Sequence, residues 1–452
     1  MKPRIISRSE HRISRKLVSS NALRALYRLH QNGFRAYLVG GCVRDLLLER
    51  TPKDFDIVTD ATPGQIRRLF RNCRLIGRRF RLAHLHFQNE IIEVATFRRP
   101  ARTFESSDGK ETVSKTHRFC HIRDADGMVL RDNLFGTPED DALSRDFTIN
   151  ALFYNIADFS VIDYSTGLTD LTQRLIRPIG DPYTRFTEDP VRMLRAVRFA
   201  ASHDFHIEPD AWEAIREHSS TISRVDTSRL YEEIRKTFLF GFACPAFRLL
   251  DKCGLLAALF PGLYQWVHRN SNHSVFLQTN LESLDRIYRN SASLSPALFF
   301  TSLFGPFLEE ETLVREHDGI SHQLALDAAC THFMEDIRTI INVPRRAGSQ
   351  LRAILALQDS LRKMPPRRPA FLVGKPEFAD ALTYLRITST SGRENRIIPE
   401  WWDAFLSRTS PPIPQEQPAE RTKKKRKRRK YKSRNRTLFD TEIDGQQELH
   451  RV

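Results

Sequence analysis

The sequence predicts an α+β protein made of a mixed α/β head with a small mixed sheet, an all-helical neck and body, and a disordered basic tail. Up to about residue 160, short strand-type runs are interleaved with amphipathic stretches of helical type. After residue 165, apolar residues recur with helical spacing and few stretches resemble strands. We therefore expect a head at 1–160, a neck at 161–260, a body at 261–408, and a Pro-rich linker with a Lys/Arg-rich tail at 409–452.

The head is expected to begin as helix, strand, helix and strand. Residues 20–32 carry apolar positions at helical spacing, and Gly33 suits the C-cap. The apolar run AYLVGG at 36–41 predicts a buried strand entering a turn, and a helix follows through VRDLLLER at 43–50. The alternating segment DFDIVTD at 54–60 is rich in β-forming residues and predicts a second strand.

A helix and a hairpin follow in the head. ATPGQIRRLF at 61–70 begins with a threonine suited to the N-cap and a proline suited to the first helical position. RLAHLHF at 81–87 and EIIEVATF at 90–97 predict two strands joined by a polar Gln-Asn pair. The polar segment 99–131 predicts a flexible loop.

The neck and body are helical by pattern. The clearest helical periods in the neck are DPVRMLRAVRFAASH (189–203), DAWEAIREHSS (210–220), TSRLYEEIRKTFLF (227–240) and FRLLDKCGLLAALF (247–260). From 261 to about 408 the apolar spacing stays helical. The Pro-rich stretch 411–420 then predicts an unstructured linker.

The positive charge of the chain is concentrated in its tail. Residues 421–436 hold 12 Lys or Arg and no acid, so the net charge of +16 falls to about +4 without them. Such a block has nothing apolar to bury, and its natural partner is a polyanion such as RNA. A solvated solubility tail is one alternative, and a nuclear-localisation signal is another if the source is eukaryotic. The predicted RNA-binding residues are Lys423, Lys424, Lys425, Arg426, Lys427, Arg428, Arg429 and Lys430.

Composition excludes several classes of protein. The longest apolar runs fall far short of the roughly 18 residues that a membrane helix needs. The basic N-terminus lacks the apolar region of a secretory signal, although a mitochondrial presequence is an alternative. Six scattered cysteines with no CxxC pair argue against a zinc ribbon or a disulfide framework and suit a reducing cytosol.

Asp54 and Asp56 are the first candidates for chemistry. Residues i and i+2 of a strand point to the same face, so two carboxylates there lie side by side and repel unless a cation sits between them. Divalent ions such as Mg²⁺ favour oxygen ligands of this kind. Two such ions can activate an attacking hydroxyl and stabilise a leaving pyrophosphate. Because a lone DxD is weak evidence, its context decides.

The context includes Gly40 and Gly41, fourteen residues before Asp54, between a predicted strand and a predicted helix. Glycines there let the backbone approach a triphosphate, and the following helix start favours negative charge. The pair matches neither GxGxxG nor GxxxxGK[ST], so neither a Rossmann nor a P-loop site follows.

Four ordered motifs resemble those of the class II tRNA nucleotidyltransferase and bacterial poly(A) polymerase superfamily. They are LVGGCVRDLLLERTPKDFDIVTDATP (38–63), SRDFTINAL (144–152), DYSTGLTDL (163–171) and EDPVRMLRAVRFA (188–200). The third matches the pattern D-x3-G-x2-DL and the fourth contains EDxxR. Cys42, Glu49 and Ser144 depart from the usual glycine, glycine and arginine of the family, but no carboxylate is lost.

The resemblance implies a nucleotidyltransferase head and assigns roles to its residues. Asp54 and Asp56 would bind Mg²⁺, with Mn²⁺ as the alternative, and Asp146 would be a third catalytic carboxylate. Glu93 is a second candidate for that carboxylate, or a salt-bridged strand residue. The residues implied to bind the nucleotide are Gly40, Gly41, Arg44, Asp45, Arg145, Asn150, Asp189, Arg192 and Arg195. Asp189 and Arg192 are suited to read a base, since an acceptor and a fork of donors match its Watson–Crick edge. Arg198 is expected to be structural or ion-paired.

The flanks resemble bacterial poly(A) polymerases. The resembling stretches are 11–29, 71–87, 132–143, 341–355, 399–405 and the basic tail. The resemblance implies template-independent addition of AMP from ATP to RNA 3′ ends, in mRNA polyadenylation and RNA turnover. Its implied setting is the bacterial cytoplasm, or an organelle if the source is eukaryotic. The sequence identifies no RNA-degradation or RNA-chaperone partner.

Three other functions compete with this one. A CCA-adding enzyme would share the head and neck motifs, so only the flanks argue against it. A non-catalytic RNA-binding module would have no reason to keep Asp54, Asp56 and Asp146 together. A metal-dependent phosphohydrolase could rest on His317-Asp318, but this pair lacks evident partner ligands and predicts a surface turn.

Overall fold

A computed structural model describes most of the chain outside the tail. The described residues are 2–77, 82–99, 122–123, 129–131, 135–291, 294–389 and 397–409. The pattern of contacts groups Met1–Asp403 as one compact unit and Ala404–Val452 as a second. The predicted linker and basic tail lie outside the described residues, and the boundaries between head, neck and body stay predictions. In the described ranges, no helix is both long and apolar enough to cross a membrane.

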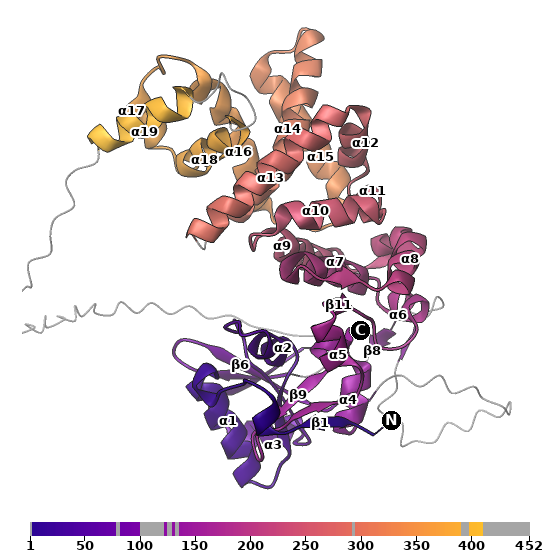
Figure 1. Cartoon of the computed structure of the whole chain (residues 1–452). Helices are drawn as coiled ribbons and strands as arrows, with labels where there is room; N and C mark the ends of the chain where they lie inside the picture. Colours follow the sequence, from indigo (N-terminus) through magenta and orange to yellow (C-terminus); the bar gives the residue numbers. More distant parts are fainter. Residues whose placement is uncertain are drawn as a thin grey trace, which may run out of the picture. The chain divides into compact units, whose positions relative to one another are not determined.

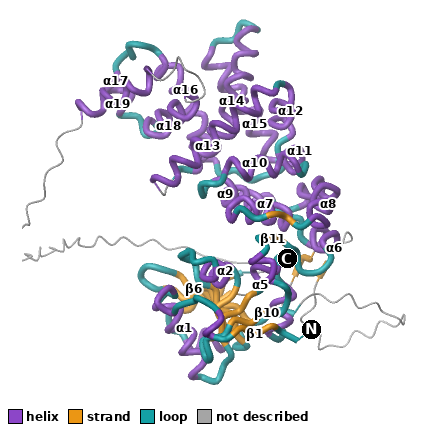
Figure 2. The backbone as a smooth tube through the Cα atoms, in the orientation of Figure 1, coloured by secondary structure: helices purple, strands orange, loops and turns teal. Residues whose placement is uncertain are grey.

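The head contains an eight-stranded mixed sheet, whose strands are orange in Figure 2. Its order is β1-β10-β9-β2-β3-β6-β5-β4, and only β3 and β6 pair in parallel. The strands are β1 (Arg4–Ile6), β2 (Ala36–Val39), β3 (Asp56–Thr59), β4 (Cys73–Ile76), β5 (Leu82–His86), β6 (Ile91–Thr96), β9 (Leu152–Asn155) and β10 (Val161–Asp163). The predicted α+β class and mixed sheet are confirmed.

The described residues form five α-helices between Ser20 and Thr172. They are α1 (Ser20–Gln31), α2 (Gly41–Leu47), α3 (Pro63–Leu69), α4 (Pro138–Ser144) and α5 (Gly167–Thr172). Thr62 is the N-cap of α3 and proline takes its first turn, as the sequence predicts, and Thr62 also forms a capping box with Gln65 that was not predicted. Gly33 follows the C-cap Asn32 with a φ of +81°, a conformation that glycine adopts without strain.

The sheet has a dense apolar core. Val39, Val58 and Phe153 come from three adjacent strands and pack with Phe97 and Ala142. Helix α1 packs against β2 and β3, and α3 packs against β4 and β5. Because both ends of β2 are fixed by neighbours, the turn that follows Val39 has a defined position.

Helices dominate the chain after the head (Figure 1). They are α6 (Pro182–Glu188), α7 (Val191–His203), α8 (Pro209–His218), α9 (Thr227–Phe238), α10 (Ala243–Lys252), α11 (Leu255–Leu259), α12 (Pro261–Arg269), α13 (Ser271–Ser291), α14 (Pro296–His317), α15 (His322–Arg338), α16 (Arg345–Arg362), α17 (Pro369–Val373), α18 (Phe378–Ser389) and α19 (Ile397–Thr409). Helix α14 contacts α13, α15, α16 and α18. Its Phe299, Phe300 and Phe304 are buried, which makes α14 the centre of the helical core.

Several short strands were not predicted. β1, β4, β9 and β10 are three or four residues long; β4 pairs with the nearby β5, whereas β1, β9 and β10 each have a partner distant in sequence. Two small ladders also formed, β11 (Leu175–Ile176) with β12 (His206–Ile207) and β7 (Ile122–Arg123) with β8 (Val129–Arg131). The prediction of one continuous loop over 99–131 is therefore wrong at β7 and β8, and its other residues after Arg99 lie outside the described ranges.

Candidate active site

The turn between β2 and α2 places the predicted glycines at the C-terminal end of β2, a central strand of the sheet. Gly40 has φ +79° and ψ −138°, a region that residues other than glycine rarely adopt. A Cβ added at Gly40 would lie 3.2 Å from Arg145 Nη1, 3.8 Å from Asp56 Oδ2 and 3.9 Å from the Asn150 carbonyl oxygen. The structure thus gathers Gly40, Asp56, Arg145 and Asn150, all predicted site residues, in one corner, which we call the Gly40 corner.

The backbone positions of Asp54 and Asp56 differ from the prediction. Strand β3 begins at Asp56, so the expectation that Asp54 also lies on the strand is wrong. The reason is the register: Asp56 pairs with Val39, the last residue of β2, which leaves no β2 partner for residues before Asp56. On its other side Asp56 pairs in parallel with Glu93 of β6. Asp56 therefore lies between the Gly40 turn and a second carboxylate.

The charges around Asp56 favour a cation. Burial, followed by the negative charges of Glu93 and Asp54, raises the pKa of Asp56 to about 6, while Arg145 and Arg98 oppose the rise. A divalent ion would offset this repulsion between carboxylates. Across the ranges that the structure describes, no group of three or more His, Cys, Asp or Glu is arranged as a metal site. Carboxylates such as Asp54 and Asp56 are the ligands that Mg²⁺ takes while it keeps its other positions for water and phosphate, and their role as its ligands stays a prediction.

Glu93 has a second neighbour. Its Oε1 lies 3.2 Å from His84 Nε2 on the adjacent strand β5, and about half of its side chain is exposed. Glu93 thus lies beside Asp56 in the sheet and also contacts His84. This geometry fits both interpretations from the sequence, an extra carboxylate and a salt-bridged strand residue. Its chemical role stays a prediction.

Arg145 forms an ion pair with Asp141, which holds its guanidinium in position. Two Arg145 nitrogens donate to Asp141 Oδ2 at 2.8 and 3.1 Å, and the Asp141 side chain is fully buried. Burial alone would raise the pKa of Asp141, but Arg145 and Arg98 hold it below its usual range. Ser144, the departure from the family pattern, donates its hydroxyl to the Asp141 carbonyl at 2.8 Å. The Arg145 guanidinium is therefore presented to the Gly40 corner by a buried ion pair.

Arg44 and Asp45 contact each other and the interior. The Arg44 guanidinium donates to Asp45 Oδ1 at 2.8 and 2.9 Å and to Asn150 Oδ1 at 2.8 Å. It also lies 5.1 Å from the centre of the Phe199 ring. Arg44 is 6% exposed, so it holds Asn150 in place from within the protein. Nucleotide contact by Arg44 or Asp45 stays a prediction.

Asp146 joins the head to α7. Its Oδ2 accepts from Arg195 at 2.6 Å, and its Oδ1 accepts from Asn150 at 3.2 Å. Burial alone would raise the pKa of Asp146, but Arg195 and the hydrogen bonds from Asn150 and the Phe147 backbone hold it well below its usual range. Arg195 also lies 3.6 Å from Glu233 of α9. Asp146 is thus an ionised partner of Arg195, and its role as a third catalytic carboxylate stays a prediction.

The EDxxR residues form a separate set on α6 and α7. Asp189 accepts both arms of the Arg229 guanidinium, at 2.8 and 2.7 Å. Arg192 donates to Glu188 Oε2 at 3.3 Å and to the Arg185 carbonyl at 2.9 Å. Asp189 also lies within electrostatic range of Arg195. These hydrogen bonds join residues of α6, α7 and α9 and the residue between α6 and α7. None of them joins Asp189 or Arg192 to a residue of the Gly40 corner.

Arg185 of α6 connects the EDxxR set to the Gly40 corner. Arg185 Nη2 donates to the carbonyls of Ser144 at 3.1 Å and Arg145 at 2.6 Å. Arg185 Nη1 also donates to Glu188 at 2.9 Å. The base-reading candidates and the Gly40 corner are therefore connected through the backbone at Arg145.

Sequence reasoning missed several residues of this network. They are Arg98, Asp141, Arg185, Glu188, Arg229 and Glu233. The spacing of four residues between Asp141 and Arg145, and between Glu188 and Arg192, was a signal that could have found two of them. Arg229 and Glu233 contact residues about forty positions away, and no local pattern marks them.

The family departures and the alternative metal pair have structural explanations. Cys42 is buried, donates to the Val39 carbonyl at 3.2 Å, and has a thiol pKa raised by burial to about 12. Glu49 keeps the positive φ, +58°, that a glycine would adopt easily, and it pairs with Arg12. His317 and Asp318 are exposed at the end of α14, as predicted for a surface turn.

Comparison with known proteins identifies relatives over nearly the whole chain. Three family models match: "Poly A polymerase head domain" at 36–177, "Probable RNA and SrmB- binding site of polymerase A" at 204–266, and "Polymerase A arginine-rich C-terminus" at 318–437. The chain is 41% identical over 412 residues to Poly(A) polymerase I of Salmonella typhimurium, which spans 90% of this chain and 86% of the relative. It is 35% identical over 238 residues to the CCA-adding enzyme of Lactobacillus gasseri, which spans 53% and 54% of the two chains.

A solved structure of a nucleotide-adding enzyme has a similar fold. The crystal structure of the Bacillus stearothermophilus CCA-adding enzyme in complex with CTP matches with a TM-score of 0.59 and 26% identity, over 86% of this chain and 80% of that one. Together with the Gly40 corner, the fold defines a nucleotidyltransferase of the class II type. The chain belongs to the bacterial poly(A) polymerase family and is a polynucleotide adenylyltransferase. The family prediction is confirmed, and CCA addition is the activity of more distant relatives.

Proposed function

We propose that this chain transfers AMP from ATP to the 3′ end of RNA without a template, releasing pyrophosphate, and that the Gly40 corner is where the transfer occurs. The observation that supports this most is the placement of Gly40 beside Arg145 and Asp56, whose side chains lie 3.2 and 3.8 Å from where a Cβ would stand. A backbone without a side chain, a fixed cation and a carboxylate in one corner suit a nucleoside triphosphate. Asp54 and Asp56 would hold Mg²⁺, or Mn²⁺, which when bound activates an attacking hydroxyl and neutralises phosphate charge.

The protein groups orient the nucleotide in this proposal. The Gly40 backbone lets the triphosphate approach closely, and the Arg145 guanidinium donates to a phosphate or ribose oxygen. Asn150, held by Arg44 at 2.8 Å, supplies a further polar group at the same corner. Asp189 and Arg192 select the base, and the Arg229 and Glu188 contacts keep each in position. Because protein groups select the nucleotide, no template strand is required.

A bacterial cytoplasmic location is part of the proposal. The matched relative is bacterial. The five cysteines in the described part of the chain are free thiols, which suits a reducing compartment.

The test of this function varies which nucleotides are supplied. Purified protein with Mg²⁺ would receive either a generic RNA or a tRNA lacking its terminal CCA, with ATP alone, CTP alone, or both. A long ladder on the generic RNA with ATP alone is the expected result. Addition limited to CCA on the tRNA, requiring both nucleotides, would contradict the proposal and favour CCA addition.

A further inference from the structure

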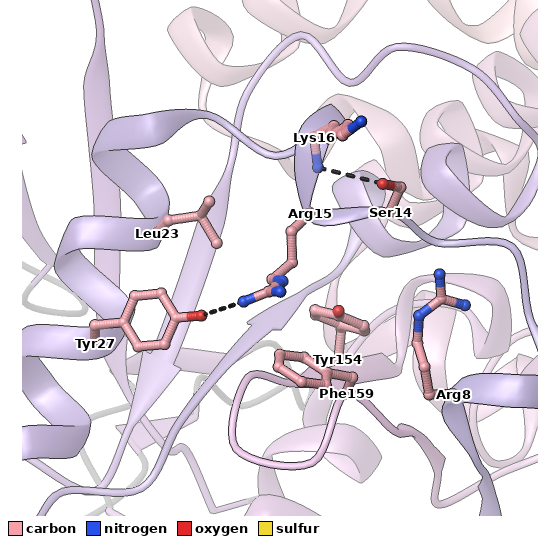
Figure 3. Close-up of a pocket in the computed structure, with 8 residues that line it drawn as sticks. All are labelled: Arg8, Ser14, Arg15, Lys16, Leu23, Tyr27, Tyr154 and Phe159. Atoms are coloured by element: carbon pink, nitrogen blue, oxygen red, sulfur yellow. Dashed lines mark hydrogen bonds between the residues drawn. The ribbon is translucent and has the colours of Figure 1, made fainter.

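A cleft lies at the end of the sheet opposite the Gly40 corner (Figure 3). Strand β9 is antiparallel to β2, with Phe153 opposite Val39 and Asn155 opposite Tyr37. The turn after β9 is therefore at the end where β2 begins, whereas Gly40 follows the end where β2 finishes. The cleft has a volume of about 440 Å³, which falls in the size range of ligand sites.

Arg15 projects between aromatic residues in this cleft. Its guanidinium lies 4.6 Å from the centre of the Phe159 ring and donates to the Tyr27 hydroxyl at 3.1 Å. Figure 3 shows Arg15 pointing between Tyr27 on one side and Tyr154 and Phe159 on the other. A ring and a hydroxyl orient the guanidinium without neutralising it. Its neighbour Arg12, by contrast, is paired with Glu49 at 2.5 Å.

The turn that carries Phe159 is constrained. Phe159 has a φ of +62°, a left-handed conformation that is unfavourable for a bulky side chain. The His11 ring holds the Phe159 carbonyl, with Nε2 at 2.8 Å. The carboxylate of the same turn, Asp158, accepts from both the backbone and the hydroxyl of Ser160. The aromatic ring, rather than the carboxylate, is the group that this turn presents to the cleft.

The rim of the cleft is positive. Arg8 and Lys16 line it with Arg15, and Arg8 donates to the His11 carbonyl at 2.9 Å. Among the residues that the structure describes, no carboxylate forms an ion pair with Arg8, Arg15 or Lys16. Both Arg8 and Lys16 are exposed. Unneutralised cations beside stacking surfaces are the combination with which proteins bind single-stranded nucleic acid.

We propose that this cleft binds one unpaired nucleotide of the RNA, with the base stacked on the surface formed by Arg15 and Phe159 and phosphates near Arg8 and Lys16. Every base has a π-face, so such a subsite accepts any RNA sequence. The choice of RNA as the ligand rests on the proposed function. The subsite lies at the far end of the sheet, so it holds RNA without taking part in AMP transfer.

Three variants test the subsite. Phe159→Gly removes the ring but suits the positive φ, so the turn is expected to keep its fold. The double variant Arg8→Gln/Lys16→Gln removes the two rim charges. Arg24→Gln is the matched control, because Arg24 is an exposed cation of α1 that does not line the cleft. Binding of a fluorescent oligo(A) would be measured by anisotropy at several salt concentrations, without ATP.

We expect Phe159→Gly to weaken oligo(A) binding by roughly fivefold to tenfold without changing its salt dependence. The Arg8/Lys16 variant should lower the magnitude of the log–log salt slope by about 1.4, or 0.7 for each phosphate contact. Oligo(A) binding by both variants that equals that of Arg24→Gln would overturn the proposal. So would equilibrium dialysis in which Phe159→Gly loses ATP but keeps oligo(A), because the occupant would then be a free nucleotide.

This binding assay needs no catalysis. A wild-type chain that adds no AMP to any RNA but shows the expected pattern of oligo(A) affinities would refute the proposed function and leave the subsite standing. A chain that adds AMP normally but shows no difference among the variants would refute only the subsite.

Discussion

Gly40→Ala is the perturbation that most directly tests the geometry of the Gly40 corner. At φ +79° and ψ −138°, an alanine would be strained by about 1–3 kcal/mol. Its Cβ would also lie 3.2 Å from Arg145 Nη1, so the guanidinium would have to move by a few tenths of an ångström. If the strain is relieved by displacing the Gly40 turn or Arg145, we expect kcat/KM for ATP to fall by roughly tenfold to a hundredfold.

Gly33→Ala is the control for backbone strain. Gly33 also has a positive φ, +81°, but nothing lies within 4 Å of its added Cβ, and it follows α1 away from the corner. We expect this variant to lose about 1 kcal/mol of stability while keeping near-normal kcat/KM. Steady-state AMP incorporation and thermal melting of both variants give the comparison. Equal kcat/KM values for the two variants would refute the role of the Gly40 turn.

Further predictions concern the neck, base selection and the tail. Asp146→Asn removes the charge that pairs with Arg195; since the two side chains are 12% and 29% exposed, we expect a loss of about 2 kcal/mol, seen as a lower melting temperature at pH 7. The pKa of Asp146 is lowered in the folded protein, so the ion pair contributes its stability at pH values above the pKa of about 3.9 that Asp has in the unfolded chain, and this contribution is lost as the pH falls below it. The difference in melting temperature between wild type and Asp146→Asn should therefore narrow from about pH 4 downwards. A difference that stays constant over this pH range would contradict the ion pair. Arg229→Ala, which removes the two guanidinium hydrogen bonds to Asp189, should reduce the preference for ATP over CTP in single-addition assays, and an unchanged preference would argue against base selection by Asp189. Deleting 421–436 should weaken RNA binding and flatten its salt dependence, and an unchanged slope would show that the tail does not contact RNA.

Local patterns predicted the elements that depend on local physics. The N-cap at Thr62, the alternation in β3 and the Gln-Asn hairpin between β5 and β6 each involve residues close in sequence. The strands β1, β9 and β10 were missed because three or four residues carry little periodicity, and these strands are stabilised by partners far along the chain. The end of β2 at Val39 similarly decides where β3 begins, which the local pattern around Asp54 could not show.

The candidate site was predictable to the extent that its residues carry motifs. The sequence indicated Gly40, Asp56, Arg145 and Asn150, and the structure places them together. It did not indicate that Asp146 is paired with Arg195, because that contact depends on how α7 packs against the head. Arg229 was missed because its contact with Asp189 depends on how α9 packs against α7.

The central claim is that Asp54 and Asp56 hold the divalent ion that AMP transfer requires. The most direct measurement follows Mn²⁺ binding by electron paramagnetic resonance and AMP addition to RNA in the same preparations, for the wild-type chain, Asp54→Asn and Asp56→Asn. We expect the wild type to bind Mn²⁺ and extend RNA, and each variant to lose both while retaining oligo(A) binding. Variants that extend RNA at near wild-type rates, or that bind Mn²⁺ as the wild type does, would contradict the assignment of these two carboxylates as the metal site.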